Sequence, residues 1–104
     1  MLMEVRELRY FLAVAREENI TRAAESLHIA QPSLSKQLME LEKKLGKKLL
    51  IRGKRKITLT EEGVLLRKRA EEILELVEKT QQEISSDTED VIGDIYMGGG
   101  TPPS

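Results

Sequence analysis

The most regular feature of this sequence is a stripe of leucines between residues 31 and 46. The stripe consists of Leu34, Leu38, Leu41 and Leu45. Steps of three and four residues place side chains on one face of an α-helix. Pro32 fits the first turn of that helix, where its missing N–H costs little, and Gly46 is a suitable C-terminal stop. A helix with one apolar face must bury it, so the rest of the chain has to supply a core around these leucines.

Two further helices are predicted before the leucine stripe. Apolar residues repeat with helical spacing over residues 5–18, and Asn19 interrupts the pattern. Thr21 can then cap a short helix that ends at Leu27. We interpret His28, which follows, as a turn residue at a positive φ that histidine tolerates, rather than as a ligand or a base.

After Gly46 the pattern changes to that of two short strands. Residues 49–51 and 57–59 flank a basic loop that contains glycine, which predicts a β-hairpin. Thr60 can cap a final helix whose apolar and small residues alternate at steps of four and three, interrupted by Thr80. Such a seam is typical of a coiled-coil contact. We expect it to form a dimer through Leu66, Ala70, Ile73, Val77 and Ile84.

The predicted order is helix, helix, helix, hairpin, helix. This is a mainly α fold: a winged helix-turn-helix (three helices and a β-hairpin wing) followed by a long dimerisation helix. We assign residues 1–60 to the winged helix-turn-helix, residues 61–87 to the dimerisation helix, and residues 88–104 to a hinge and the first strand of a truncated domain. Residues 91–97 would be that strand; a disordered tail is the alternative interpretation.

The composition argues against several classes of function. The chain has no cysteine, so a disulfide framework, a zinc finger and a thiol nucleophile are excluded. Its one histidine has no cluster of partners, and no Lys-Ser/Thr follows the glycines at residues 98–100, so we expect no enzyme, no metal and no cofactor. No uncharged apolar run approaches the roughly 20 residues of a membrane span, and nothing resembles a signal peptide. We therefore expect a soluble, cytoplasmic protein.

Charge is distributed unevenly along the chain. Residues 1–60 contain 13 Lys and Arg against 7 Asp and Glu, whereas residues 61–104 contain 4 against 11. The overall formal charge of −1 conceals this difference. A basic front and an acidic back favour an anionic partner for the front only. An uneven but merely solvated surface is the alternative.

Two helices joined by a tight break form the arrangement of a DNA-reading helix-turn-helix. The small Ala23 and Ala24 let the helices cross closely, and Lys36 lies opposite the leucine face. That exposed face offers hydroxyls, an amide and a cation, which suit the base edges and phosphates of a major groove. The alternatives are a packing motif or a helical module that binds another protein.

The hairpin loop is strongly basic, with Arg52, Lys54, Arg55 and Lys56 around Gly53 and no acidic neighbour. Such a wing can lie along the phosphate backbone or enter a minor groove. Lysines on an exposed edge strand can alternatively serve to prevent aggregation. Beside a helix-turn-helix we favour DNA contact, because a protein-docking module has no need of four cations there.

In these segments the sequence resembles the LysR-type transcriptional regulators. The resemblance extends over about residues 4–92. Ala30 stands where that family often has a serine as helix cap, which weakens the cap. The motifs that carry the resemblance are LRYFLAVA at residues 8–15, TRAAESLHIAQPSLS at 21–35, LEKKLG at 41–46, Leu49-Leu50 with Arg52, and LTEEG at 59–63.

The resemblance implies a homodimer joined by the dimerisation helix, and often a tetramer built from two such dimers. It implies that this assembly binds an interrupted inverted repeat in double-stranded DNA and regulates transcription. It also implies a following two-lobed domain, similar to periplasmic binding proteins, that binds a small-molecule effector. Residues 93–99 look like the first strand and turn of that domain. Near the wing tip, Arg55 is an expected phosphate contact. By position, the DNA-contacting roles of the family fall on Thr21, Arg22, Gln31, Pro32, Ser33, Ser35, Lys36, Gln37, Arg52 and Lys54.

Overall fold

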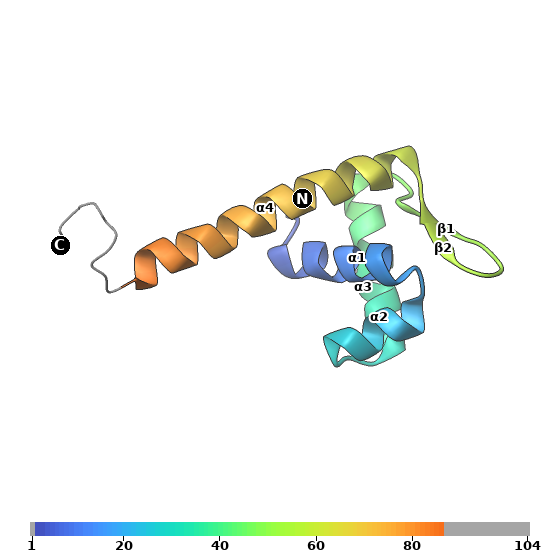
Figure 1. Cartoon of the computed structure of the whole chain (residues 1–104). Helices are drawn as coiled ribbons and strands as arrows, with labels where there is room; N and C mark the ends of the chain where they lie inside the picture. The colour runs from blue at the N-terminus through green and yellow to red at the C-terminus, as the bar shows by residue number, and fades with distance from the viewer. Residues whose placement is uncertain (1, 87–104) are drawn as a thin grey trace. The chain divides into compact units, whose positions relative to one another are not determined.

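The computed structural model describes residues 2–86, and the chain divides into two compact units, Met1–Leu74 and Glu75–Ser104. The elements follow the predicted order (Figure 1): α1 (Val5–Glu17), α2 (Ile20–Leu27), α3 (Gln31–Leu45), β1 (Leu50–Arg52), β2 (Ile57–Leu59) and α4 (Glu61–Ser85). The expectation of a mainly α, winged helix-turn-helix with a long final helix is confirmed. The hinge assigned to residues 88–104 and the strand predicted at 91–97 lie outside the described residues.

The corner between α1 and α2 differs from its prediction in one cap. Glu18 ends α1 in a left-handed conformation, with φ 56°. Asn19 is extended, and its side-chain oxygen accepts the Arg22 N–H at 2.8 Å. Thr21, the predicted cap, lies instead within the first turn of α2. The prediction was wrong because a cap must precede the first helical residue, and Ile20 is already helical.

α3 begins and ends where the sequence predicts. Its N-terminal cap residue, Ala30, makes no side-chain hydrogen bond, and Pro32 lies in the first turn. Gly46 ends the helix at φ 68°, and its N–H donates to the Glu42 carbonyl at 2.8 Å. His28 has a φ of 60°, which confirms its interpretation as a turn residue.

The leucine face of α3 forms the centre of the core. Leu34 and Leu41 are fully buried, and Leu38 is almost so. The two small residues of α2 are also buried, which fits the predicted close crossing of the two helices. The same cluster contains Phe11 and Val14 of α1 and Ala23 and Ala24 of α2.

One buried charge joins α1 to α3. The Glu7 carboxylate is 3% exposed. It accepts hydrogen bonds from the Lys44 ammonium at 2.8 Å and from the Glu4 N–H at 2.9 Å. Burial acts to raise the pKa of Glu7, but the hydrogen bonds from Glu4 and Lys44 and the positive charge of Lys44 outweigh it, so this pKa lies below its ordinary value. The pair holds the start of α1 against the second half of α3.

β1 and β2 form an antiparallel hairpin that packs one face on the core. Leu50 pairs with Leu59 and Arg52 with Ile57. Leu50 and Ile57 are buried in the core cluster, while Ile51 is exposed. Because an isolated two-stranded ribbon is only marginally stable, this packing is what allows so short a hairpin to form.

α4 begins at a cap that also ties it to the hairpin. Thr60 Oγ1 accepts the Gly63 N–H at 3.0 Å, as predicted for a cap, and donates to the Lys48 carbonyl at 2.7 Å. Gly63 is buried, and a Cβ at this position would collide with the Leu49 carbonyl oxygen. The first turn of α4 therefore sits directly on the base of the hairpin.

Candidate nucleic-acid interface

α3 has a free face opposite its leucines. Of the predicted contact residues on this helix, Ser35 and Gln37 are half-buried. Gln37 lies about 100° further round the helix than Lys36, toward the leucine face, so its side chain is directed away from the centre of the free face. The exposed ones are Gln31, Pro32, Ser33 and Lys36.

The cations of this surface are not neutralised by the protein itself. Within residues 2–86, Lys36 and Lys43 of α3 form no ion pair, and neither does Arg22 of α2. All three are exposed. Unpaired surface cations keep their attraction for an anionic partner, which makes this face suitable for a phosphate backbone.

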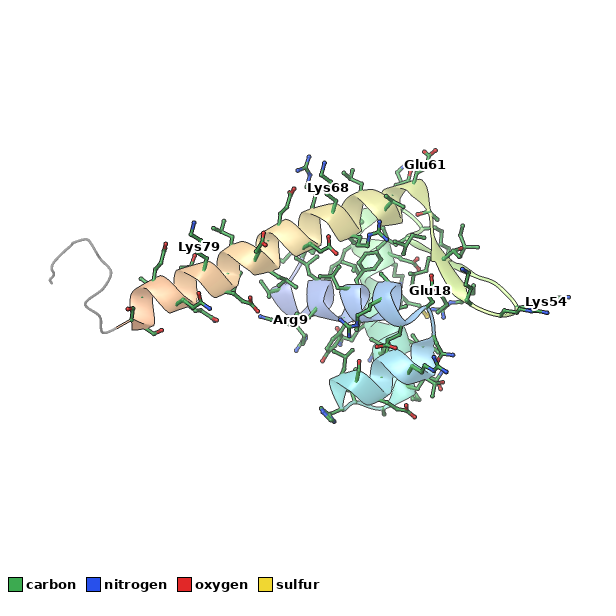
Figure 2. The ribbon with its side chains drawn as sticks, in the orientation of Figure 1. Arg9, Glu18, Lys54, Glu61, Lys68 and Lys79 are labelled. Atoms are coloured by element: carbon green, nitrogen blue, oxygen red, sulfur yellow. The ribbon has the colours of Figure 1, made fainter. Side chains whose placement is uncertain are left out.

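The start of α2 is attached to the second strand of the hairpin. The Glu18 carbonyl, in the corner just before α2, accepts the Ile57 N–H at 2.9 Å. The Glu18 carboxylate also lies 3.9 Å from the Lys56 ammonium, and Figure 2 shows Glu18 beside the hairpin. Thr21 and Arg22, both exposed, are therefore held close to the start of β2, beside the hairpin loop.

A carboxylate of α3 that the sequence analysis did not single out holds the other strand. Glu42 Oε2 accepts the N–H groups of Leu49 at 2.8 Å and Leu50 at 3.2 Å, and Oε1 lies 3.8 Å from the Lys48 ammonium. The Glu42 side chain is only 12% exposed. The sequence places Glu42 beside the leucine face, one turn after Leu38, and a carboxylate there needs a hydrogen-bond partner. This position was the feature that could have identified it. The hairpin is thus tied both to α3 and to the α1–α2 corner.

The tip of the hairpin, which forms the wing, is a small, concentrated positive surface. The Gly53 N–H donates to the Lys56 carbonyl at 3.1 Å, and a Cβ on Gly53 would lie 2.9 Å from that oxygen. Arg52, Lys54 and Arg55 are exposed and have no ion pair within the described part of the chain. Lys54 stands at the outer end of the hairpin and points away from the helices (Figure 2).

The predicted dimer seam on α4 falls into two parts. Leu66 is partly buried against the core and Ala70 has no exposed surface, so both are already covered within the single chain. Ile73 is 37% exposed, Ile84 is 80% exposed, and Val77 is partly exposed. A dimer contact through these three residues stays a prediction. Other exposed apolar residues of α4 are Val64, Leu65 and Leu76.

Within residues 2–86, no group of three or more histidine, aspartate or glutamate side chains is placed to hold a metal ion. No helix in that part of the chain combines the length and the apolar composition needed to cross a membrane.

The sequence matches a protein-family model described as the bacterial regulatory helix-turn-helix protein, lysR family, over residues 5–64. The matched segment runs from the start of α1 into the first turn of α4. It therefore contains α2, α3 and the wing, and with them every residue predicted to contact DNA.

Two curated relatives are closely similar. BsdA, an HTH-type transcriptional regulator of Bacillus subtilis (strain 168), is 47% identical over 97 residues, covering 92% of this chain and 33% of that protein. HcaR, the Hca operon transcriptional activator of Escherichia coli (strain K12), is 52% identical over 79 residues, covering 76% of this chain and 27% of that protein. The chain spans about a third or less of the length of these relatives.

A solved structure has the same fold. The crystal structure of the BenM DNA-binding domain in complex with benA site 1 DNA matches with a TM-score of 0.76 and 44% identity, covering 79% of this chain and 95% of that chain. The family match covers more than half of the chain, and its elements are those of the winged helix-turn-helix described above. The chain belongs to the LysR family of bacterial regulatory helix-turn-helix proteins.

Proposed function

We propose that this chain binds double-stranded DNA sequence-specifically and thereby regulates transcription. The first two turns of α3 enter the major groove, while the start of α2 and the wing hold the phosphate backbone. The similar BenM domain was crystallised with its DNA site, and HcaR is an operon activator; both facts support the proposal.

The observation that carries the proposal is electrostatic. The five cations expected to meet DNA are exposed and have no ion pair within residues 2–86. Each cation that neutralises a phosphate releases counterions, so binding should weaken by about 0.9 log units per log unit of salt for each contact. The five are Arg22, Lys36, Arg52, Lys54 and Arg55.

The active form is a homodimer joined through α4. Ile73 and Ile84 expose apolar surface along this helix, which a second copy would cover. Two-fold symmetry then presents two copies of α3 to an interrupted inverted repeat. The full-length protein forms tetramers from two such dimers.

Transcription is regulated in response to a small-molecule effector. Residues 88–104 lead from the DNA-binding part into the effector-binding domain of the full-length protein. The length of the curated relatives, of which this chain covers about a third or less, leaves room for such a domain.

Two single substitutions test which residue recognises the base sequence and which contacts phosphate. Lys36 lies on the free face of α3, where a lysine can reach guanine O6 or N7. Lys36→Ala should cost on the order of 1–3 kcal/mol at the cognate site and relax preference at one or two base positions. Arg55→Ala, on the wing, should weaken binding to all sequences about equally and reduce the salt slope by about one unit per lost phosphate contact.

The measurement is the dissociation constant of each variant on cognate and scrambled duplexes at two salt concentrations. The cognate duplex comes from selection out of a random DNA pool. If Lys36→Ala lowers both affinities in parallel while Arg55→Ala changes sequence preference, the two roles are reversed. A binding constant that does not change with salt would contradict DNA binding and favour a protein-interaction module.

A further inference from the structure

Met39 lies on the free face of α3 and has no role in the function proposed above. It is 60% exposed, and of the described residues in α2 and α3 it alone is a large apolar residue with an exposed side chain. It lines an open groove of about 750 Å³ that begins at the N-terminal turn of α3. The groove is also lined by Pro32, Ser35, Lys36, Glu40 and Lys43.

Helix geometry aligns Met39 with the residues expected to read bases. It follows Ser35 by four positions and Lys36 by three, so its side chain neighbours both of them on the helix surface. Three residues advance an α-helix by roughly 4.5 Å, whereas neighbouring base pairs are about 3.4 Å apart. When Lys36 meets one base edge, Met39 therefore faces a position one to two base pairs away.

The charge of the groove favours DNA as its occupant. Four lysines line it, at residues 36, 43, 47 and 48, against two glutamates. One of these, Glu42, already binds the N–H groups at the base of the hairpin. Lys36 and Lys43, on either side of Met39, have no ion pair within residues 2–86. A groove lined by an exposed apolar side chain and by unpaired cations fits a base edge flanked by phosphates.

A major groove offers an apolar side chain one kind of apolar group, the 5-methyl group of thymine. We propose that Met39 is a specificity-determining residue that contacts this methyl group, one to two base pairs from the base read by Lys36. The inference rests on the proposed function, because it requires α3 to lie in a major groove.

Replacement of thymidine by deoxyuridine tests the contact between Met39 and the methyl group, since deoxyuridine lacks only that group. Each thymine of the selected half-site is replaced in turn, and binding is measured for the wild type and for Met39→Ala. The wild type should lose about fourfold in affinity at one thymine, the value expected for one buried methyl-sized group. Met39→Ala should bind the two duplexes equally at that position, and more weakly than the wild type binds the thymine duplex.

Two further variants serve as controls. Met39→Leu keeps an apolar side chain and should keep the dependence on the methyl group. Leu2→Ala removes an apolar side chain that is 80% exposed before α1, and it should respond to deoxyuridine as the wild type does. Because Met39 is exposed, its truncation should leave the far-ultraviolet circular dichroism spectrum unchanged.

The inference is overturned if Met39→Ala loses as much affinity as the wild type at every deoxyuridine. It is also overturned if the selected half-site contains no thymine. Failure of the proposed function is a different result: the wild type then selects no preferred duplex at all.

Discussion

Glu42 offers the sharpest test of how the wing is held. Its carboxylate accepts two backbone N–H groups at the base of the hairpin, from Leu49 at 2.8 Å and Leu50 at 3.2 Å. Both leucines are buried, with exposed fractions of 2% and 7%. Glu42→Ala removes the acceptor, and water has little access to replace it.

The expected loss follows from these contacts. A buried donor left without a partner costs about 1–3 kcal/mol. For two such donors the free energy of unfolding should fall by about 2–6 kcal/mol. We expect a loss in the lower half of this range, because the hairpin can shift to admit water. The ion pair with Lys48 adds little, since its N–O distance is 3.8 Å and the lysine is 82% exposed.

Urea denaturation followed by circular dichroism measures this loss as a change in the free energy of unfolding. Glu42→Gln is the matched control, because its amide oxygen can still accept both N–H groups, and it should lose only about 1 kcal/mol. DNA binding should change in parallel: Glu42→Ala, with its wing released from α3, should bind with a smaller salt slope. A free energy of unfolding within about 0.5 kcal/mol of the wild type, or equal losses for alanine and glutamine, would refute the reasoning.

Three other predictions follow from the packing. Gly63→Ala should lower the free energy of unfolding by roughly 1–3 kcal/mol despite the helix preference of alanine, because its Cβ meets the Leu49 carbonyl. Gly46→Ala, at φ 68° with open space around it, should lower it by only about 1 kcal/mol. Urea denaturation that ranks the two losses the other way would contradict this. Because the pKa of Glu7 is lowered in the folded chain, its stabilising effect is present above its ordinary pKa of 4.5 and is lost as the pH falls through the folded pKa. Glu7→Gln should flatten that part of the curve of stability against pH, and parallel curves would count against the Lys44 ion pair. Ile73→Asp should convert a dimer into a monomer in sedimentation at tens of micromolar, whereas a wild-type chain that is already monomeric there removes the basis for an α4 contact.

Features governed by local rules could be predicted from the sequence. The α3 leucines, the stop at Gly46 and the left-handed His28 all follow from helix periodicity and from which residues accept a positive φ. The exposed cations of the wing follow equally directly, because the tip of a short hairpin cannot bury them. The fold and the location of the candidate DNA-binding surface depend mainly on features of this kind.

Features decided by tertiary packing could not be predicted. Asn19 and Thr21 are both good caps by residue type, and they differ by only two positions. In the folded chain the helix begins at Ile20, which packs against the core, and the Asn19 side chain just before it accepts the Arg22 N–H. Glu42 is a similar case, because its partners are seven and eight residues further along the chain.

The seam on α4 is a further feature whose packing could not be predicted from the sequence, and here the packing affects the proposed dimer. Its apolar alternation continues from Leu66 through Ala70 to Ile73, so periodicity assigns all three residues to one contact. Burial separates them: Leu66 packs on the core of its own chain, Ala70 is fully covered, and Ile73 is 37% exposed. A periodic stripe shows that a helix face needs a cover, but not which surface supplies it. In our proposal the domain itself covers the stripe as far as Ala70, and the contact with a second copy begins at Ile73.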